Sequence, residues 1–298
     1  MRLAAVIALG FLAACASAEA PAPAPDTPVR SLGEILEQSP ASDWRTVDQD
    51  NLIYMQLPRG RVIIELAADY TPNHAANIRA LARAHYWDGA AIVRSQDNYV
   101  VQWGRDEADP RPMGEGVASL APEFDRPRAG VDITRLVDPD SYAREVGFAY
   151  GFPVASNGQR TWLTHCYGMV GAGRGDTADS GSGAELYVVI GQAPRHLDRN
   201  ITTVGRVLQG MELLSVMPRG TGPLGFYETP QERTAIASIR LGSELPESER
   251  VNFEALRTDS ATFRDVIESR RFRRESWFLD PVGHVNVCNV QLPVRVRQ

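Results

Sequence analysis

Short apolar runs separated by turn residues recur along the chain and predict many strands and few helices. Residues 52–57 and 61–66 are two such runs on either side of the turn at 58–60, which predicts a β-hairpin. Further strands are expected at 90–95, 99–104, 116–124, 184–191, 200–210 and 234–242. This pattern predicts a mainly β fold, a closed antiparallel barrel with helices at its ends.

The clearest helical pattern lies at residues 71–87. Thr71 suits the N-cap and Pro72 suits the first helical position. The expected buried face of this helix comprises Ala75, Ile78, Leu81, Ala82 and His85. Shorter helices are expected at 31–40, 211–217 and 260–274. The last of these is amphipathic, with arginines opposite its apolar side, and is expected to dock on the rest of the protein.

The first 14 residues have the features of a signal peptide, an arginine followed by an apolar stretch too short to cross a bilayer. The letters LAAC that end at Cys15 resemble the bacterial lipobox, which predicts a lipidated cysteine. Residues 15–45 would then form a lipidated tether and a short helix. The alternative is ordinary cleavage after residue 18. Both predict an exported protein on the periplasmic side of the envelope, either an outer-membrane lipoprotein or a soluble periplasmic protein.

The composition excludes several classes of function. The 298 residues carry a formal net charge of −6, which argues against a nucleic-acid partner because such proteins need a basic surface. The sequence contains no lysine, so all 31 basic residues are arginine. Schiff-base chemistry and a phosphate-loop lysine are therefore excluded. The glycine-rich segment 170–183 fits neither a nucleotide-binding fingerprint nor a calcium loop, and no cofactor is expected.

Two cysteines remain in the exported protein once Cys15 is set aside. Cys166 and Cys288 are an even number in an oxidising compartment, so a disulfide and two buried thiols are both open interpretations. His284 lies four residues before Cys288, but Pro281 and Gly283 argue against a helix there. No close pair of ligands supports a metal site, and none is predicted.

Four segments, taken in order, resemble the cyclophilin type of peptidyl-prolyl isomerase. Residues 60–89 resemble the opening strand and helix of that family, and "AAIVRSQDNYVVQWGR" at 90–105 resembles its arginine stretch and glutamine strand. Residues 167–191 and 196–214 resemble its later strands and the loops between them. The resemblance runs from about residue 48 to 243. It implies an eight-stranded closed barrel capped by two helices.

The resemblance also implies a domain organisation. The isomerase domain would span 46–243, with an insertion at 126–160, and residues 244–298 would form a C-terminal extension that packs on the barrel. Residues 106–160 are rich in proline, glycine, aspartate and arginine, and they predict irregular loops apart from the strand at 116–124. A monomer is expected.

Arg94 lies at the end of an apolar strand. An arginine in such a place often has no functional role, and its side chain simply carries the charged group to the solvent. The resemblance instead implies that Arg94 is a catalytic donor and that Gln102 orients it and the substrate. The implied substrate-binding residues are Tyr99, Val100, Met169, Gly171, Tyr187, His196, Leu197 and Ile201. The apolar members of this set suit a barrel core equally well.

Four residues depart from the family pattern: Gly171, Glu185, His196 and Ile201. The changes at 171 and 201 are expected in or beside the substrate groove, and they put the rate and the sequence preference in doubt. The implied function is isomerisation of X–Pro bonds in exported proteins, whose proline-containing segments are the expected partners. The main alternative is a proline-peptide binding module that uses the same groove with little catalysis. A third interpretation is a hydrolase or metal protein that shares only the barrel fold, but no catalytic or metal-binding motif in the sequence supports it.

Overall fold

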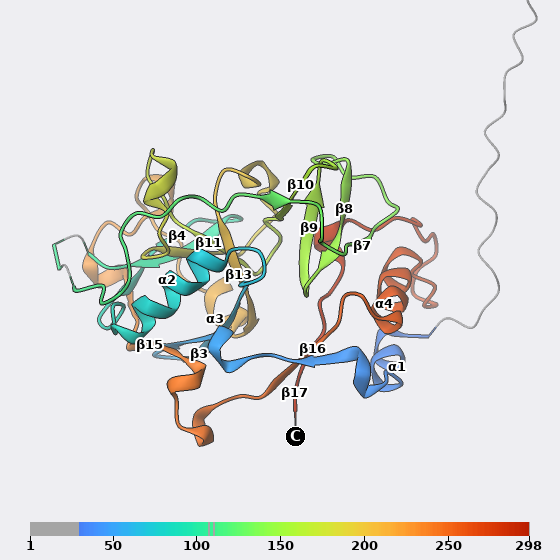
Figure 1. The fold of residues 1–298 in the computed structure, drawn as a ribbon, viewed down its shortest axis with the longest axis horizontal. Helices are drawn as coiled ribbons and strands as arrows, with labels where there is room; N and C mark the ends of the chain where they lie inside the picture. Colours follow the sequence, from blue (N-terminus) through green and yellow to red (C-terminus); the bar gives the residue numbers. More distant parts are fainter. Residues whose placement is uncertain (1–29, 107, 110, 298) are drawn as a thin grey trace, which may run out of the picture.

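The structure is a computed structural model that describes residues 30–106, 108, 109 and 111–297. The predicted signal peptide at 1–14 and the predicted lipidated Cys15 lie outside the described residues. No helix in the described part of the chain is both long and apolar enough to cross a membrane. Figure 1 shows a large curled sheet at one end of the long axis and a smaller sheet with helix α4 at the other.

Nine strands form the large sheet and confirm the predicted mainly β character. They are β2 (Leu52–Leu57), β3 (Gly60–Leu66), β4 (Ala91–Ser95), β5 (Val100–Gly104), β11 (Met169–Ala172), β12 (Leu186–Val189), β13 (Thr203–Gln209), β14 (Thr234–Ala235) and β15 (Ser238–Leu241). Their order across the sheet is β14-β4-β5-β12-β11-β13-β3-β2-β15, and all neighbours are antiparallel. The predicted hairpin at 52–66 is β2 and β3.

The prediction of a closed barrel of eight strands is not confirmed, because the sheet has nine strands and two edges. The edge strands β14 and β15 are consecutive in the chain, and only Ile236 and Ala237 separate them. The Ile236 amide donates to the carbonyl oxygen of Ala90 and the Ala237 amide donates to that of Gln56. The segment at 234–241 therefore pairs first with β4, through β14, and then with β2, through β15. The sheet is curled, but β14 and β15 do not pair with each other, so it stays open.

Helix α2 (Pro72–Arg83) covers the core of the curled sheet. Four of the five residues expected on its buried face are inaccessible to solvent: Ala75, Ile78, Leu81 and Ala82. His85 was wrongly placed on that face. It is exposed and has a φ of 53°, because the helix has already ended at Arg83. The other helices in the described residues are α1 (Leu32–Glu37), α3 (Met211–Ser215) and α4 (Ala261–Arg271).

The insertion at 126–160 is not irregular, which corrects the prediction for that part of 106–160, whereas the described residues between 106 and 125 form no helix or strand, as predicted apart from 116–124. It forms a five-stranded antiparallel sheet in the order β6-β10-β9-β8-β7. The strands are β6 (Arg126–Pro127), β7 (Thr134–Arg135), β8 (Glu145–Ala149), β9 (Phe152–Ser156) and β10 (Arg160–Leu163). The strand expected at 116–124 does not form, because its polar groups bind α2 instead: the Val117 amide donates to Asn77, and Glu123 accepts from the first amides of the helix.

The C-terminal extension contacts both sheets. Strand β16 (Phe253–Leu256) pairs with β1 (Trp44–Thr46) and β17 (Val294–Val296), and its Phe253 packs with β2 and β3. The predicted apolar side of α4 is buried against the insertion sheet, where the ring of Phe263 meets Phe148 edge-on at 5.0 Å. The insertion and the extension thus share a second core.

A disulfide ties this second core to the large sheet. Cys166, just before β11, is bonded to Cys288 in the extension, with an S–S distance of 2.06 Å. Of the two interpretations left open by the sequence, the structure selects the disulfide over the pair of buried thiols.

Candidate active site

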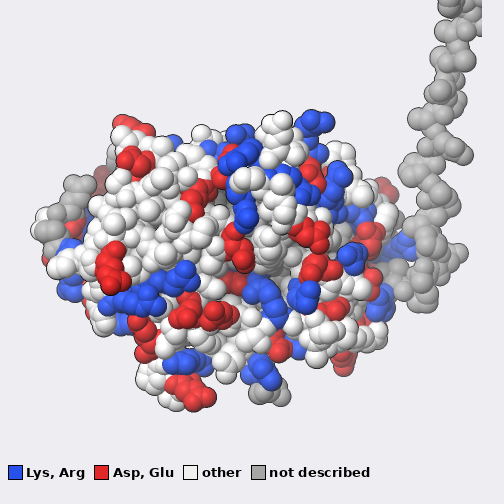
Figure 2. All heavy atoms as spheres, viewed as in Figure 1, with Lys and Arg blue, Asp and Glu red and all other residues white. Residues whose placement is uncertain are grey.

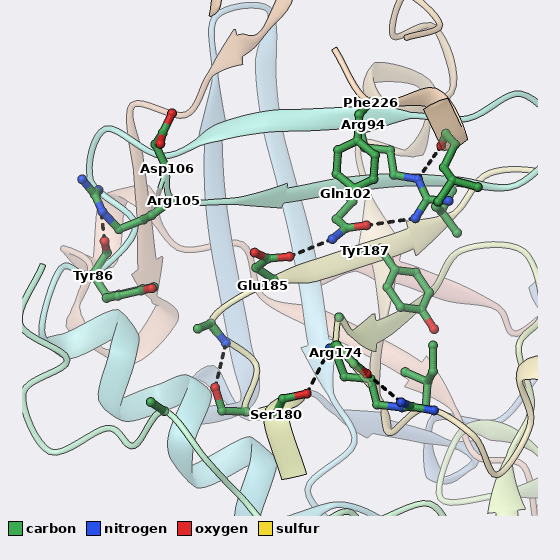
Figure 3. Close-up of a pocket in the computed structure, with 18 of the residues that line it drawn as sticks. Tyr86, Arg94, Gln102, Arg105, Asp106, Arg174, Ser180, Glu185, Tyr187 and Phe226 are labelled. Carbon is green, nitrogen blue, oxygen red and sulfur yellow. Dashed lines mark hydrogen bonds between the residues drawn. The ribbon is translucent and has the colours of Figure 1, made fainter. Parts of the chain in front are cut away.

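A groove of about 740 Å³ lies across strands β4, β5 and β12 of the curled sheet. Arg94 on β4 stands directly opposite Gln102 on β5, next to an irregularity in the ladder between Ile92 and Arg94. A bulge of this kind changes the direction in which a strand's side chains point. Here it brings the guanidinium and the amide together on the groove side, as Figure 3 shows.

Arg94 is fixed by three hydrogen bonds and is not extended into solvent. Its Nε donates to the carbonyl oxygen of Leu224 at 2.7 Å, and its Nη1 donates to Oε1 of Gln102 at 3.2 Å. Its Nη2 donates to Oε1 of Gln96. Burial lowers the pKa of Arg94, and the nearby hydroxyls of Tyr99 and Tyr187 partly oppose this shift. An arginine nevertheless stays charged in proteins at neutral pH.

Gln102 connects Arg94 to Glu185. Its Nε2 donates to Oε2 of Glu185 at 2.8 Å while its Oε1 accepts from Arg94. The side chain of Glu185 passes over Gly104 and Gly173, where an added Cβ would lie 2.8 Å and 3.3 Å from its carbons. Glu185 therefore reaches Arg94 through Gln102, and it fixes the direction of the amide.

The wall of the groove beside Arg94 is apolar and aromatic. Among the predicted pocket residues, five line the groove: Tyr99, Val100, Tyr187, Leu197 and Ile201. Four of these also belong to a small cluster with Val189. The guanidinium carbon of Arg94 lies 5.6 Å from the centre of the Tyr99 ring, within the range of a cation–π contact.

Three predicted pocket residues do not line this groove. Met169 faces the second core and borders a different cavity. Gly171 lies behind the Tyr187 ring, and an added Cβ there would come within 2.3 Å of the Tyr187 hydroxyl oxygen. His196 stacks on the ring of Tyr99, with centroids 6.2 Å apart and planes 2° from parallel.

Leu224 and Phe226 line the groove and were not predicted. Phe226 forms an isolated β-bridge with Arg94, and its ring centre lies 5.2 Å from the guanidinium carbon. Both residues come from a glycine- and proline-rich loop that follows α3. The chain makes a left-handed turn there, with a φ of 57° at Leu224 and 78° at Gly225. The glycines at 220, 222 and 225 and the prolines at 218 and 223 are local signals of this turn, but they do not indicate what it contacts.

Comparisons with known proteins agree with this geometry. Residues 52–241 match the model of the family described as cyclophilin type peptidyl-prolyl cis-trans isomerase/CLD. The chain belongs to the cyclophilin family. A probable peptidyl-prolyl cis-trans isomerase of Brucella suis is 23% identical over 192 residues, which cover 64% of this chain and 80% of that protein. The peptidyl-prolyl cis-trans isomerase-like 3 of Gallus gallus is 24% identical over 160 residues, 54% of this chain and 77% of its own length.

A solved structure extends the likeness beyond the cyclophilin domain. The crystal structure of the cyclophilin AquaCyp293 from Hirschia baltica aligns with a TM-score of 0.69 and 24% identity. The alignment covers 90% of this chain and 97% of that one. The shared fold therefore includes much of the insertion and of the C-terminal extension as well as the cyclophilin domain.

Behind the groove of this cyclophilin, a buried hydrogen-bond chain holds Tyr187. Its hydroxyl lies 2.9 Å from Nε2 of His165, whose Nδ1 lies 3.0 Å from Oδ1 of Asp198. Burial raises the pKa of Tyr187, so the hydroxyl keeps its proton. Burial would also raise the pKa of Asp198, but hydrogen bonding from His165 and the charge of Arg195 outweigh it and hold this pKa below its usual value.

Two of the protons of this chain follow from those pKa shifts. The ionised Asp198 can only accept, so Nδ1 of His165 donates to it, and the protonated hydroxyl of Tyr187 lies at hydrogen-bond distance from Nε2. Gly171 leaves the space that this hydroxyl needs. The glycine, the histidine and the tyrosine thus act as a matched set that fixes one wall of the groove, although sequence analysis identified only Gly171 and Tyr187.

Replacing Tyr187 by phenylalanine should lower the free energy of unfolding by about 1–3 kcal/mol, because the buried Nε2 of His165 loses its hydrogen bond at 2.9 Å and keeps, among the described residues, only the longer contact of 3.4 Å to Oγ1 of Thr203. Urea denaturation followed by circular dichroism measures this change. Tyr99→Phe is the matched control. Within the described residues the Tyr99 hydroxyl makes no hydrogen bond, so its loss should cost less than about 0.5 kcal/mol. Equal stability of the two variants would show that the bond between Tyr187 and His165 does not stabilise the fold.

Proposed function

We propose that this chain is a peptidyl-prolyl isomerase that accelerates rotation about X–Pro bonds in exported or envelope proteins, without a covalent intermediate. One observation carries the proposal. A guanidinium has five N–H donors, and the three bonds to Leu224, Gln102 and Gln96 leave two of them without a partner among the described residues, beside the apolar wall of the groove. Arg94 is thus both fixed in position and able to donate to a bound peptide.

The chemistry needs this combination. Rotation about a peptide bond faces a barrier of ~18–20 kcal/mol because the nitrogen lone pair is delocalised into the carbonyl group. In the twisted transition state that lone pair returns to the prolyl nitrogen, which becomes able to accept a hydrogen bond. A donor that binds the twisted state more strongly than the planar state lowers the barrier. A fixed, charged donor in a site that excludes water is especially effective.

The other groove residues take two further roles. Tyr99, Val100 and Ile201 offer apolar surface to the proline ring, which keeps water away from the rotating bond. Gln102, held between Arg94 and Glu185, keeps the guanidinium in place and presents its amide to the peptide backbone. No metal or cofactor is needed for this reaction.

The test is an isomerisation assay, either coupled to a protease or followed by NMR exchange, on a panel of Xaa-Pro peptides. Residues 30–298 are suitable because they contain every element of the described fold. We expect cis–trans exchange much faster than the uncatalysed reaction, which takes tens of seconds or longer at an X–Pro bond. Peptide binding without any acceleration would instead identify a proline-peptide binding module.

We also propose that the protein is exported and anchored by a lipid on Cys15, on the strength of the apolar leader and the LAAC sequence. Cys15→Ser should remove the lipid mass from the mature N-terminus and release the protein from membranes washed with carbonate, because a covalent lipid anchor resists that wash and a peripheral contact does not. Immunoblots of the washed membranes and of the wash, with mass spectrometry of the mature N-terminus, measure this change. Unchanged partitioning with no lipid mass would show that the lipidation proposal is wrong.

A further inference from the structure

The segment that follows α4 exposes large apolar side chains. Trp277, Leu279 and Val282 are 81%, 96% and 87% exposed. We call residues 275–283 the apolar loop. Isolated surface hydrophobics are common, but three within six residues, one of them a tryptophan, form a patch of the kind that marks an interaction site. The loop forms no helix or strand, and the ring of Phe278 supports Trp277 edge-on at 4.9 Å.

Arginines border the apolar loop on the side of α4. Arg273 lies over the ring of Phe278 at 5.3 Å, and Arg274 lies over that of Phe272 at 5.6 Å. Arg270 donates to Gln291. Two exposed carboxylates, Glu275 and Asp280, belong to the loop itself. Three arginines against two carboxylates leave a small positive excess, so apolar contact would supply most of the binding and charge would add to it.

The N-terminal tether reaches the described structure beside the same helix. Arg30, the first described residue, forms an ion pair with Asp265 in the middle of α4. Asp265 is six residues from the last residue of the helix, which corresponds to about 9 Å along its axis. The tether therefore arrives within a short distance of the apolar loop. Figure 1 places α4 at the opposite end of the long axis from β4, which carries Arg94.

We propose that the apolar loop is a membrane-contact site. Trp277, Leu279 and Val282 enter the interface of a lipid bilayer, and the flanking arginines contact its phosphate groups. Tryptophan favours the membrane–water interface, and arginine keeps its charge at the headgroups while its stem lies on apolar surface. This orientation would turn the groove away from the bilayer, toward soluble clients. The proposal rests neither on isomerase activity nor on lipidation of Cys15.

The chain offers a selective probe for this contact. Of its five tryptophans, Trp44, Trp87, Trp103 and Trp162 are buried, and Trp277 is exposed. A change in tryptophan fluorescence on mixing with vesicles therefore reports on the apolar loop. Residues 30–298 carry neither the apolar leader nor Cys15, so any binding they show comes from the folded part.

We expect residues 30–298 to sediment with vesicles of phosphatidylcholine and phosphatidylglycerol. Trp277 emission should shift to shorter wavelength, and brominated acyl chains should quench it. Binding to phosphatidylcholine alone should be weaker, because the arginines then lack anionic headgroups. The double variant Leu279→Asp/Val282→Asp keeps the probe and should bind at least tenfold more weakly. Both sites are exposed, so the variant should fold normally.

Val216→Asp is the matched control, because Val216 is 59% exposed but lies after α3 on the large sheet. It should bind vesicles as the parent does. The absence of a fluorescence shift and of sedimentation with both vesicle types would overturn the proposal, as would parent-like binding by Leu279→Asp/Val282→Asp. A blue shift that depends on protein concentration and needs no vesicles would overturn it in favour of contact between two copies of the chain.

Discussion

Arg94→Ala should lower kcat/KM for Xaa-Pro isomerisation by about ten- to a thousandfold, on the order of 1.4–4 kcal/mol of transition-state stabilisation. The substitution removes the guanidinium that lines the groove and leaves the apolar wall beside it in place. Peptide binding should therefore weaken far less than catalysis. The rate is measured with the assay described above, and affinity is measured by titration with the same peptides.

Two further variants separate the roles of charge and pocket. Arg94→Lys should restore little activity, because an ammonium cannot keep the bonds to Gln102 and Leu224 and still present two donors to the peptide. Tyr187→Ala should weaken binding and catalysis together, since the groove wall contacts the planar and the twisted peptide alike. A folded Arg94→Ala variant with parent-like kcat/KM would return Arg94 to the class of surface arginines.

A change in the overall charge of the protein would not explain a lower kcat/KM of Arg94→Ala. Figure 2 shows arginine and acidic side chains interspersed over the face drawn, so a single substitution changes the general field only slightly. The effect of Arg94 should come from its local geometry. Variants of exposed arginines far from the groove, such as Arg59→Ala at the β2–β3 turn, should therefore keep parent-like kinetics.

The sequence predicted most strands of the large sheet because their apolar runs are short and bounded by turn residues, whereas β11 was not among the expected strands and β14 and β15 were expected as one strand. The insertion was misinterpreted for a physical reason. Its strands β8 and β9 meet at Tyr150-Gly151, where both φ angles are positive, 53° and 89°, as in the tight turns that join hairpin strands. Proline at 153 and many nearby glycines pointed to loops, since proline cannot donate in a ladder. Burial against α4 outweighs that local preference.

Local sequence patterns also identified only part of the groove. Arg94 and Gln102 could be identified because they lie on adjacent strands eight residues apart, in an order that the family shares. Their catalytic role remains a prediction. His165 and Asp198 are 33 residues apart, and Phe226 is 132 residues from Arg94, so only the folded chain brings them to the site. No local pattern marks a residue that acts across such distances.

The disulfide should supply about 4–5 kcal/mol of the free energy of unfolding. It closes a loop of 122 residues, and a cross-link of that span removes much conformational freedom from the unfolded chain. Its loss should be felt first in the second core, because Cys288 belongs to the extension that packs on the insertion. The double variant Cys166→Ala/Cys288→Ala, in urea denaturation, tests this expectation.

The parent should lose stability when denatured in the presence of a reductant, whereas Cys166→Ala/Cys288→Ala should be insensitive to it. Cys166 follows His165, which holds Tyr187 in the groove wall, so the bond also fixes one end of the segment on which that wall depends. Below the unfolding transition, the double variant should therefore bind proline peptides more weakly while Arg94 still donates. Two free thiols in protein isolated without reductant, or equal urea midpoints with and without reductant, would show that the bond does not stabilise the native protein.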